Sequence, residues 1–324
     1  MKHTAFLSVM DYSTDELAHL FDVAIDLKKK LKAGVPTPIL QGKTLAMIFQ
    51  KPSLRTRVSF EIGMHQLGGY AFYLSPDEIG LGKREAIKDV AQVIAGYVDG
   101  IMARVFSHQH LVELAQYAGI PVINGLSDFN HPCQAMADGL TMIEEFGTLK
   151  GIHIAYIGDG NNVAVSLMDI AVKMGANFAI ANPEKYAMPD EAIAAAQDVA
   201  KTTGSRLSFE LDPFAAVKGA NVIYTDTWVS MGQESEKAER EKIFAPYQVN
   251  RELVAAADPN CIVMHCLPSH RGQEITDEVQ DGPKSRVFPE AHNRMHAQKA
   301  ILAYLLGNAP TRSEERRVGK ECRS

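Results

Sequence analysis

Short apolar or β-branched runs alternate with segments of helical periodicity along almost the whole chain, and this alternation restricts the possible folds more than any other feature. In the first half, the runs that read as strands cover residues 44–49, 70–74, 100–105 and 121–124. The helical stretches between them lie near residues 55–67, 85–97 and 109–118. Strands that alternate with helices in this way predict βαβ units, and hence a parallel sheet with helices on both faces.

A second series of strands follows a long predicted helix, His131–Phe146, which ends near Gly147. Its strand candidates are residues 153–157, 178–181, 207–210, 222–225 and 262–265. We therefore expect an α/β protein with two doubly wound parallel-sheet domains, residues 1–147 and 148–289, and a last helix, 290–306, that packs back on the first domain. The length of 324 residues fits two domains of about 150 residues each.

Composition and charge exclude several classes of protein. No apolar run reaches the roughly 18 residues of a membrane span, and the first residues have neither the apolar core of a signal peptide nor the Arg-rich character of a transit peptide. We therefore expect a cytoplasmic protein that does not act at a membrane. The net charge is −6 and no basic block precedes the extreme C-terminus, which argues against nucleic acid as a partner. The four cysteines show no CxxC pairing, which argues against a disulfide or zinc framework.

The last thirteen residues, RSEERRVGKECRS (312–324), abandon the preceding pattern and have no apolar periodicity. They resemble the conceptual translation of a sequencing-adapter oligonucleotide, so we interpret 312–324 as a non-native tail; the alternative is a disordered basic tail. Without its five basic and three acidic residues, the rest of the chain carries a net charge of −8. The body of the protein is therefore clearly acidic.

The segment FQKPSLRTRVSFE, Phe49–Glu61, concentrates positive charge and hydroxyl groups at a predicted strand-to-helix turn. Ser53 can cap the helix that follows, while the backbone N–H groups of its first turn and the helix dipole favour a phosphate there. Arg55 can add a two-pronged contact to phosphate oxygens and Thr56 a hydroxyl, whereas Arg57 can anchor the loop to a carboxylate. The segment therefore predicts an anion site; the alternative is a salt-bridged surface turn.

Two further segments can complete such a site. Arg104 lies inside the apolar run GIMARVF, where an unpaired guanidinium would be costly, so it binds either an anion or a structural carboxylate. In FNHPCQAMADG, Pro132 at the first helical position leaves His131 and Gln134 near the N-terminal end of the helix. A His-Pro pair by itself often marks only the start of a helix.

The turn YIGDGNNV has Gly158 and Gly160 in positions superficially like those of a dinucleotide-binding turn. The third glycine is missing, however, and the next predicted strand is followed by Asn-Pro rather than by the acidic residue that a ribose requires. Asn161 and Asn162 are better suited to hydrogen-bonding a small polar ligand.

Two other predicted strands end in polar residues. Asp226 ends one of them and is followed by the loop Ser230–Gly232, and the other ends in His265, Cys266 and Leu267. The carboxyl ends of strands are where open α/β sheets bind ligands. Cys266 and His265 do not predict a nucleophile pair, because adjacent residues on a strand point to opposite faces.

Taken together, these segments resemble the aspartate/ornithine carbamoyltransferase family over essentially all of residues 5–307. FQKPSLRTRVSFE, MARV and HPCQ are similar to the carbamoyl-phosphate motifs of the family, and GDGNNV, DTWVSMG, HCLP and EAHNRMHAQKA to its amino-acid motifs. The resemblance implies the carbamoyltransferase fold with a Rossmann-like second domain. It is closest to the members that use ornithine, because aspartate enzymes typically carry proline at the position of Cys266 and the acetylornithine and putrescine relatives are expected to lack SMG.

The sequence departs from the family pattern at two positions. Relatives often have Gln or His near the position of Gly80, where the side chain reaches the active site of a neighbouring subunit. Gly80 cannot supply that contact, so Lys83, Arg84 or backbone would have to make it. Leu54 stands where the loop commonly has Thr, and a contact through its backbone N–H would survive this change.

The resemblance implies that the amine of ornithine attacks the carbonyl carbon of carbamoyl phosphate, without a metal or an organic cofactor. The residues implied to bind carbamoyl phosphate are Ser53, Leu54, Arg55, Thr56, Arg104, His131 and Gln134. Those implied to bind ornithine are Asn162, Asp226, Ser230, Met231, Cys266 and Leu267. The catalytic groups are implied to be Arg104, His131, Cys266 and Arg294. The family usually forms trimers, so we expect a homotrimer or an assembly of trimers.

Other functions compatible with parts of the sequence are a carbamoyltransferase for another amine, a nicotinamide dehydrogenase built on the Gly158–Val163 turn, and a ligand sensor that keeps the pocket without the chemistry. The retention of Arg55, Arg104, His131 and Cys266 argues against a sensor, because a sensor does not need groups that stabilise a transition state.

Overall fold

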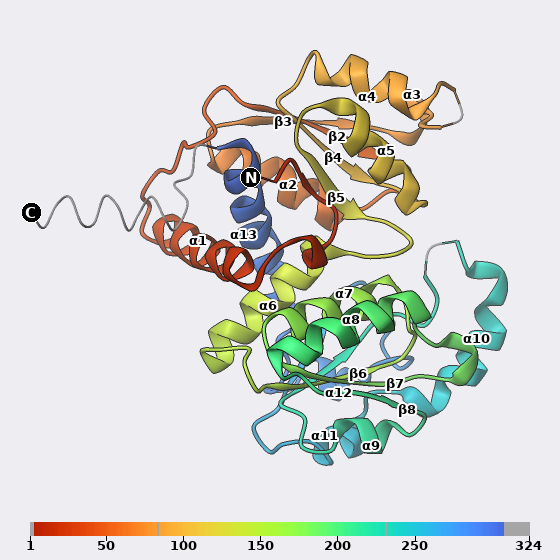
Figure 1. Cartoon of the computed structure of the whole chain (residues 1–324). Coiled ribbons are helices and arrows are strands. Elements are labelled where there is room, and N and C mark those ends of the chain that lie inside the picture. Colours follow the sequence, from red (N-terminus) through yellow and green to blue (C-terminus); the bar gives the residue numbers. More distant parts are fainter. Residues whose placement is uncertain (1–2, 83, 231, 308–324) are drawn as a thin grey trace, which may run out of the picture. The chain divides into compact units, whose positions relative to one another are not determined.

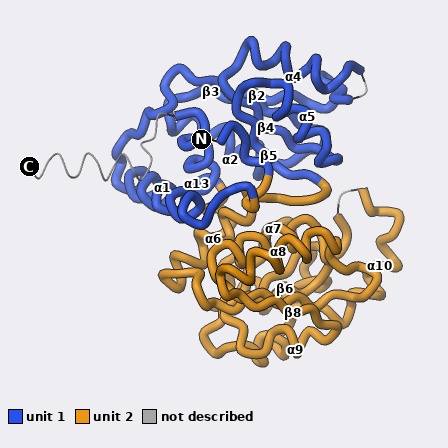
Figure 2. The backbone as a smooth tube through the Cα atoms, viewed as in Figure 1, with its two compact units in different colours: residues 1–7, 11–127, 295–324 blue, residues 8–10, 128–294 orange. Residues whose placement is uncertain are grey.

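The computed structural model describes residues 3–82, 84–230 and 232–307. These form two compact units (Figure 2): unit 1 contains residues 3–7, 11–127 and 295–307, and unit 2 contains residues 8–10 and 128–294. The tail predicted to be non-native, 312–324, lies outside the described residues, as do Lys83 and Met231.

Unit 1 is built on a five-stranded parallel sheet with the order β1-β5-β4-β2-β3. In chain order its strands are β1 (Ala5–Phe6), β2 (Thr44–Phe49), β3 (Tyr70–Leu74), β4 (Gly100–Arg104) and β5 (Val122–Leu126). The four strands predicted in this half of the sequence are present. The two-residue strand β1 was not predicted, because so short a run carries no periodicity. The interior strands are apolar on both faces, as expected for a parallel sheet covered on both sides.

Helices cover both faces of this sheet (Figure 1). They are α1 (Thr14–Lys32), α2 (Leu54–Gln66), α3 (Pro76–Ile79), α4 (Ile87–Ala95), α5 (His108–Ala118) and the unit 1 part of α13 (Val287–Leu306). One core, under α4 and α5, includes Ile48, Ile101 and Leu111. On the other face α13 packs closely: a Cβ on Gly100 of β4 would lie 2.7 Å from a methyl carbon of Leu306.

Unit 2 repeats the plan with a parallel sheet of order β10-β9-β6-β7-β8. Its strands are β6 (His153–Ile157), β7 (Asn177–Ala181), β8 (Leu207–Glu210), β9 (Val222–Thr225) and β10 (Ile262–His265). The longer helices are α6 (Pro132–Phe146), α7 (Asn162–Lys173), α8 (Asp190–Thr203) and α10 (Lys237–Phe244). The shorter ones are α9 (Pro213–Val217), α11 (Arg251–Ala255) and α12 (Asp277–Gln280). The predicted fold class, α/β with two doubly wound parallel sheets, is confirmed.

No helix within the described ranges is both long enough and apolar enough to cross a membrane.

Candidate active site

Each sheet has one point at which the chain reverses the direction in which it adds strands. In unit 1 the chain adds β3 on one side of β2 and then places β4 on the other side; in unit 2 it runs from β6 out to β8 and returns to place β9 against β6. Ligands of open α/β sheets bind at the carboxyl ends of the strands that flank such a point. The predicted site residues follow these strands: Ser53–Thr56 come after β2, Arg104 ends β4, Asn162 comes after β6 and Asp226 after β9.

The switch point of unit 1 gathers positive charge at the start of α2. Ser53 is the N-cap of α2, and its Oγ accepts a hydrogen bond from the Thr56 backbone N–H at 3.3 Å, as predicted for a cap. Phe49 and Arg104 are register partners in β2 and β4, so Arg104 ends its strand beside the turn that leads to α2. Its guanidinium Nη1 lies 3.5 Å from the Thr56 hydroxyl oxygen, and both side chains are buried.

A buried guanidinium beside a helix N-terminus places two positive charges together, since that end of the helix dipole is also positive. An anion at this position would relieve the repulsion and accept the N–H groups of the first turn. Arg55 is half-buried, and among the described residues no partner accepts a hydrogen bond from its Nε. Ser53, Arg55, Thr56 and Arg104 are therefore brought to one place, with the chemistry of a phosphate site.

Arg57 takes the structural role that the sequence allowed for it. Its Nε donates to the Glu61 carboxylate at 3.0 Å, and its guanidinium carbon lies 4.4 Å from the ring centre of Tyr73. It thus anchors the outer side of α2. Leu54, at the first position of that helix, has a side chain that is 75% exposed, so only its backbone is suited to a ligand contact.

In unit 2, Pro132 starts α6, as predicted, and places His131 and Gln134 in the first turn. Both side chains are buried. The His131 backbone N–H donates to the Ser166 hydroxyl at 2.7 Å, which fixes the start of α6 against α7. The Gln134 Nε2 donates to Asp138 at 2.7 Å and to Glu290 at 3.0 Å.

Asp226 is the centre of the second predicted group. Ile157, Thr225 and His265 are register partners in β6, β9 and β10, so the residues that follow them lie side by side at one edge of the sheet. The two oxygens of the Asp226 carboxylate have different partners: Oδ2 accepts from Asn161 Nδ2 at 2.9 Å and Oδ1 from the Cys266 thiol at 3.1 Å.

Asn161 serves the structure rather than a ligand, which differs from the expectation. Its Oδ1 caps α7 by accepting from the backbone N–H groups of Val163 and Ala164, while its Nδ2 holds Asp226. Asn162, the first residue of α7, stands at the same helix N-terminus. The two asparagines therefore differ in role. Asn161 orients the Asp226 carboxylate, whereas Asn162 lies where an anion such as an amino-acid carboxylate is favoured.

Cys266 is a protonated thiol in this setting. Burial raises its pKa well above the usual value, and the negative charge of Asp226 raises it further. His265 faces other partners: its Nδ1 accepts from the Leu267 backbone N–H at 2.9 Å, and its Nε2 therefore donates to Glu274 at 3.0 Å. The prediction that Cys266 and His265 do not form a nucleophile pair is confirmed.

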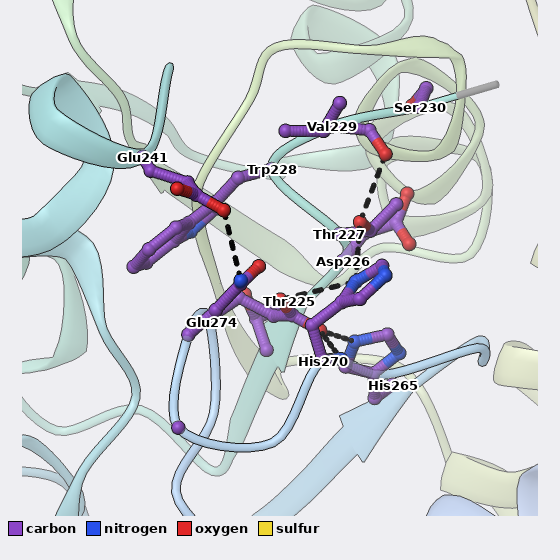
Figure 3. A network of polar contacts seen from close by, with 12 residues as sticks. Thr225, Asp226, Thr227, Trp228, Val229, Ser230, Glu241, His265, His270 and Glu274 are labelled. Carbon is purple, nitrogen blue, oxygen red and sulfur yellow. Dashed lines mark hydrogen bonds and ion pairs between the residues drawn. The ribbon is translucent and has the colours of Figure 1, made fainter. Parts of the chain in front are cut away.

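The same contacts hold the backbone after β10 in an unusual conformation. Leu267 has a φ of +58°, a region that a branched residue adopts only when its surroundings enforce it, at a cost of about 1–3 kcal/mol. Its N–H is held by His265, and Glu274 in turn accepts from the His270 backbone N–H at 2.5 Å. Figure 3 shows the side chains of His265 and His270 beside this buried glutamate.

The loop after β9 is tied to the same network. The ring Nδ1 of His270 lies 3.0 Å from the hydroxyl of Thr227, which donates to the Val229 carbonyl (Figure 3). Ser230 is half-buried, and its N–H donates to the side chain of Gln233 at 3.0 Å. Met231, the other predicted ornithine-binding residue of this loop, lies outside the described residues.

Arg294 lies in the unit 2 part of α13 and is buried. Its positive charge opposes the rise that burial causes in the pKa of Cys133 and of Asp138.

The geometry gives little support to two alternatives for this site, a metal site and a dinucleotide site. Asp226, His265 and Cys266 could offer three metal ligands within 4.8 Å of one another, but both ring nitrogens of His265 and the thiol already have protein partners. The glycine turn of a dinucleotide site needs open space at Gly160. Here a Cβ on Gly160 would lie 2.5 Å from the backbone nitrogen of Met188, so the segment before α8 fills that space.

Several buried charged residues near these groups escaped the sequence analysis. Arg240 forms an ion pair with Asp159 and donates to the Trp228 carbonyl, which ties the turn after β6 to the loop after β9. Asp138 and Glu290 bond Gln134 of the predicted site directly, and Glu274 bonds His265, which precedes Cys266. Asp138 carried a signal, because it follows Gln134 by four residues on a predicted helix and so shares its face. Glu290 and Asp159 lie inside the quoted motifs EAHNRMHAQKA and GDGNNV, but no local pattern assigned them a partner.

Comparison with known proteins agrees with this arrangement. The family model for the carbamoyl-P binding domain of aspartate/ornithine carbamoyltransferases matches residues 4–144, and the model for their Asp/Orn binding domain matches residues 150–305. An ornithine carbamoyltransferase from Thermococcus kodakarensis is 54% identical over 303 residues, which are 93% of this chain and 96% of that protein. The anabolic ornithine carbamoyltransferase of Pyrococcus furiosus is 54% identical over 305 residues, again 93% and 96%.

Solved structures agree as well. The ornithine carbamoyltransferase from Pyrococcus furiosus superposes with a TM-score of 0.92 at 51% identity, covering 94% of this chain and 98% of that one. The anabolic enzyme from Campylobacter jejuni gives a TM-score of 0.88 at 40% identity, covering 94% and 99%. The chain therefore belongs to the aspartate/ornithine carbamoyltransferase family, as its motifs predicted.

Proposed function

We propose that this chain transfers the carbamoyl group of carbamoyl phosphate to the side-chain amine of L-ornithine, giving L-citrulline and phosphate. The observation that carries the choice of acceptor is Asp226, a buried carboxylate at a sheet switch point whose two oxygens are held by Asn161 and by the Cys266 thiol. Each carboxylate oxygen can accept a second hydrogen bond, so Asp226 remains able to pair with the α-ammonium group of an amino acid.

The donor substrate is assigned to the cationic group of unit 1. Phosphate leaves during the reaction, so its negative charge grows in the transition state, and donors fixed in advance stabilise that charge. Ser53, Arg55, Thr56 and Arg104 would take the phosphate oxygens, with the Leu54 backbone N–H. The carbonyl oxygen would accept from Thr56, Arg104, His131 and Arg294, and Gln134 would hold the carbamoyl amide.

The acceptor substrate is assigned to the group around Asp226. Asn162 and the Met231 backbone would hold the carboxylate of ornithine, with help from Ser230. The amine would be oriented by the Cys266 sulfur and the Leu267 carbonyl. A protonated thiol does not attack, so Cys266 positions the amine rather than forming a covalent intermediate.

Once both substrates are correctly oriented, the transfer of the carbamoyl group needs few further catalytic groups. The amine nitrogen attacks the carbonyl carbon, the C–O bond to phosphate breaks, and the departing phosphate accepts the proton that the amine loses. Holding two reactants in the correct orientation contributes roughly 7–11 kcal/mol to such a reaction. We propose ordered binding, with carbamoyl phosphate first and then ornithine, accompanied by closure of the Ser230–Gly232 loop.

We also propose that the chain assembles into a homotrimer or an assembly of trimers. The outer face of α2 supports an assembled state, because Leu54, Val58 and Ile62, at spacings of four residues, are 75%, 46% and 42% exposed. An apolar stripe of this kind, next to the predicted phosphate site, is typical of a surface that another chain covers.

The experiment that tests the activity is citrulline formation by the purified protein from carbamoyl phosphate and ornithine. Acetylornithine, putrescine and aspartate serve as alternative acceptors at equal concentration. We expect the kcat/KM value for ornithine to exceed that for each alternative by at least about 100-fold. Acetylornithine lacks the charged α-ammonium group that would pair with Asp226, putrescine lacks the carboxylate, and aspartate lacks the side-chain amine that attacks. Equal use of acetylornithine would reject the role of Asp226, and no product with any amine would favour the ligand sensor.

A further inference from the structure

A cluster of buried polar groups beneath Gln134 has no role in the reaction as derived above. Two carboxyl groups form its centre, Asp138 on α6 and Glu290 on α13, and both are completely buried. The Tyr224 hydroxyl of β9 donates to Glu290 Oε1 at 3.0 Å and lies 3.3 Å from Asp138 Oδ1. The backbone N–H of His265 in β10 donates to Glu290 Oε2 at 2.9 Å.

The two carboxyl groups lie close together, because Gln134 Nε2 and the Tyr224 hydroxyl each lie within 3.3 Å of both Asp138 Oδ1 and Glu290 Oε1. Two like charges so near in a buried site cannot both be ionised. Burial raises the pKa of Asp138 to about 7 and that of Glu290 well above its usual value, and for Glu290 the negative charge of Asp138 adds to this rise. The pair therefore keeps one proton at neutral pH.

This pair decides which way the Gln134 amide points. Both carboxyl groups accept from its Nε2, at 2.7 Å for Asp138 and 3.0 Å for Glu290. An amide turned by 180° would instead aim its oxygen at two carboxyl oxygens, which share a single proton between them. The Gln134 Oε1 is thus left as the available acceptor, and none of the described residues donates to it.

The orientation matters because the carbamoyl group presents an NH2, which is a donor only. We propose that Asp138 and Glu290, by sharing one proton, are positioning residues that hold the Gln134 amide so that its oxygen accepts from the carbamoyl NH2 and distinguishes it from other acyl phosphates. This inference rests on the proposed function, in which Gln134 binds the carbamoyl group.

The same pair links this donor-side group to the strands that carry the acceptor site. Tyr224 comes two residues before Asp226 in the chain, and His265 comes directly before Cys266. Because both strands bond to Glu290, a shift of the pair would be transmitted to them. The charged or titratable groups that interact with the pair are Arg294, Tyr224 and Cys266. Asp226 acts on Tyr224 and Cys266 rather than on the pair itself.

The test compares two ligands that differ only in the group to which Gln134 would hydrogen-bond. Carbamoyl phosphate carries an NH2 where acetyl phosphate carries a methyl group, and both have the same acyl phosphate. We expect the wild-type protein to bind carbamoyl phosphate about tenfold more tightly than acetyl phosphate in isothermal titration, since one buried hydrogen bond is at stake. Gln134→Ala should abolish this preference, with the ratio of the two dissociation constants falling to about one.

Asp138→Ala should abolish the preference as well, although Gln134 is intact, because the amide loses one of its two acceptors and can rotate. Affinity for acetyl phosphate should change less than about threefold. Thr141→Val is the matched control: Thr141 is a buried residue of α6 whose hydroxyl bonds the Ala137 carbonyl and Asn293 of α13 rather than Gln134. That variant should keep the tenfold preference even if it is less stable.

Asp138→Asn tests whether Asp138 positions the Gln134 amide or only fills space in the core. It also provides the test if the alanine variant fails to fold. An asparagine can donate an N–H to Glu290 in place of the shared proton and still accept from Gln134, so the preference should be rescued at pH 7. In the wild type the preference should decline toward pH 9, as the pair loses its proton, and in Asp138→Asn it should stay constant. His131 is present in both proteins, so it does not account for this difference.

Retention of the full preference in Asp138→Ala would overturn the inference, and so would equal pH dependence in the wild type and Asp138→Asn. Equal weakening of both ligands would also overturn it, because that result indicates general damage. Failure of the proposed function looks different, since the wild type would then bind neither acyl phosphate or would make no citrulline.

Discussion

The thiol of Cys266 donates a hydrogen bond to the carboxylate of Asp226, with 3.1 Å between Sγ and Oδ1. The two residues are 40 positions apart in the chain, and they meet because β9 and β10 are neighbours in register. The cysteine therefore acts through its proton, as a donor that orients a carboxylate, and its chemistry as a nucleophile is suppressed.

Loss of this hydrogen bond should weaken ornithine binding specifically. In Cys266→Ala, Asp226 keeps Asn161 as a partner but loses the thiol, so we expect the KM for ornithine to rise roughly tenfold. Cys266→Ser keeps a donor and should retain most of the affinity. Steady-state kinetics at saturating carbamoyl phosphate measure both values. An unchanged KM in the alanine variant would remove Cys266 from the acceptor site.

Arg55 and Arg57 offer a matched test of the phosphate site, since they lie two residues apart on α2. Arg55→Ala should reduce kcat at least about 1000-fold with the fold intact, because the leaving phosphate loses a charged donor. Arg57→Ala breaks an exposed ion pair with Glu61 and should lower stability by less than about 1 kcal/mol with near-normal kcat. Citrulline assays and circular dichroism provide the readouts. Near-normal activity of Arg55→Ala would refute the phosphate assignment.

The two substrates are assigned to different residues, carbamoyl phosphate to the cationic group of unit 1 and ornithine to the residues around Asp226, so their order of binding can be measured. We expect ornithine to bind at least tenfold more weakly to the free protein than to its complex with carbamoyl phosphate, because loop closure depends on the bound donor. Calorimetric titration of ornithine, with and without the unreactive donor analogue phosphonoacetamide, measures the two affinities. Equal affinities would show that binding is random.

The carboxyl pair should also make stability depend on pH. The pKa of Asp138 is raised to about 7, so between about pH 4 and pH 7 the native state binds more protons than the unfolded state. Stability should therefore fall as the pH rises through this window, by roughly 2–4 kcal/mol from the pair. Urea unfolding at pH 5 and pH 7.5 gives this difference, and it should be smaller in Asp138→Asn. Identical pH dependence in the two proteins would show that the pair is not protonated in the native state.

The apolar stripe on α2 predicts how assembly can be broken. Val58→Glu places a charge in the centre of the stripe and should shift the protein to smaller species in sedimentation velocity at micromolar concentration, since burying an unpaired charge is costly. Val112→Glu, on the partly exposed side of α5, is the control and should leave the assembly unchanged. Unchanged sedimentation of Val58→Glu would show that this stripe is not an interface.

Much of the fold could be read from local patterns. Strands β6, β8, β9 and β10 lie where the runs of apolar residues predicted them, because a buried parallel strand needs such a run and little else. The starts of α2 and α6 followed from Ser53 and Pro132 for equally local reasons. The stretch predicted as a helix over 85–97 holds only α4, Ile87–Ala95, and the short helix α3 before it was not predicted.

The sequence by itself determined the order of the strands along the chain, the helix starts and the kinds of side chain that follow each strand. It could not determine which of those side chains meet. Gln134 bonds Glu290 across 156 positions and Asn161 bonds Asp226 across 65, and these partners are chosen by the strand order of the sheet and by the path of α13. The physical reason is that a buried polar group needs a partner in space, and only the packed structure decides which residue that is.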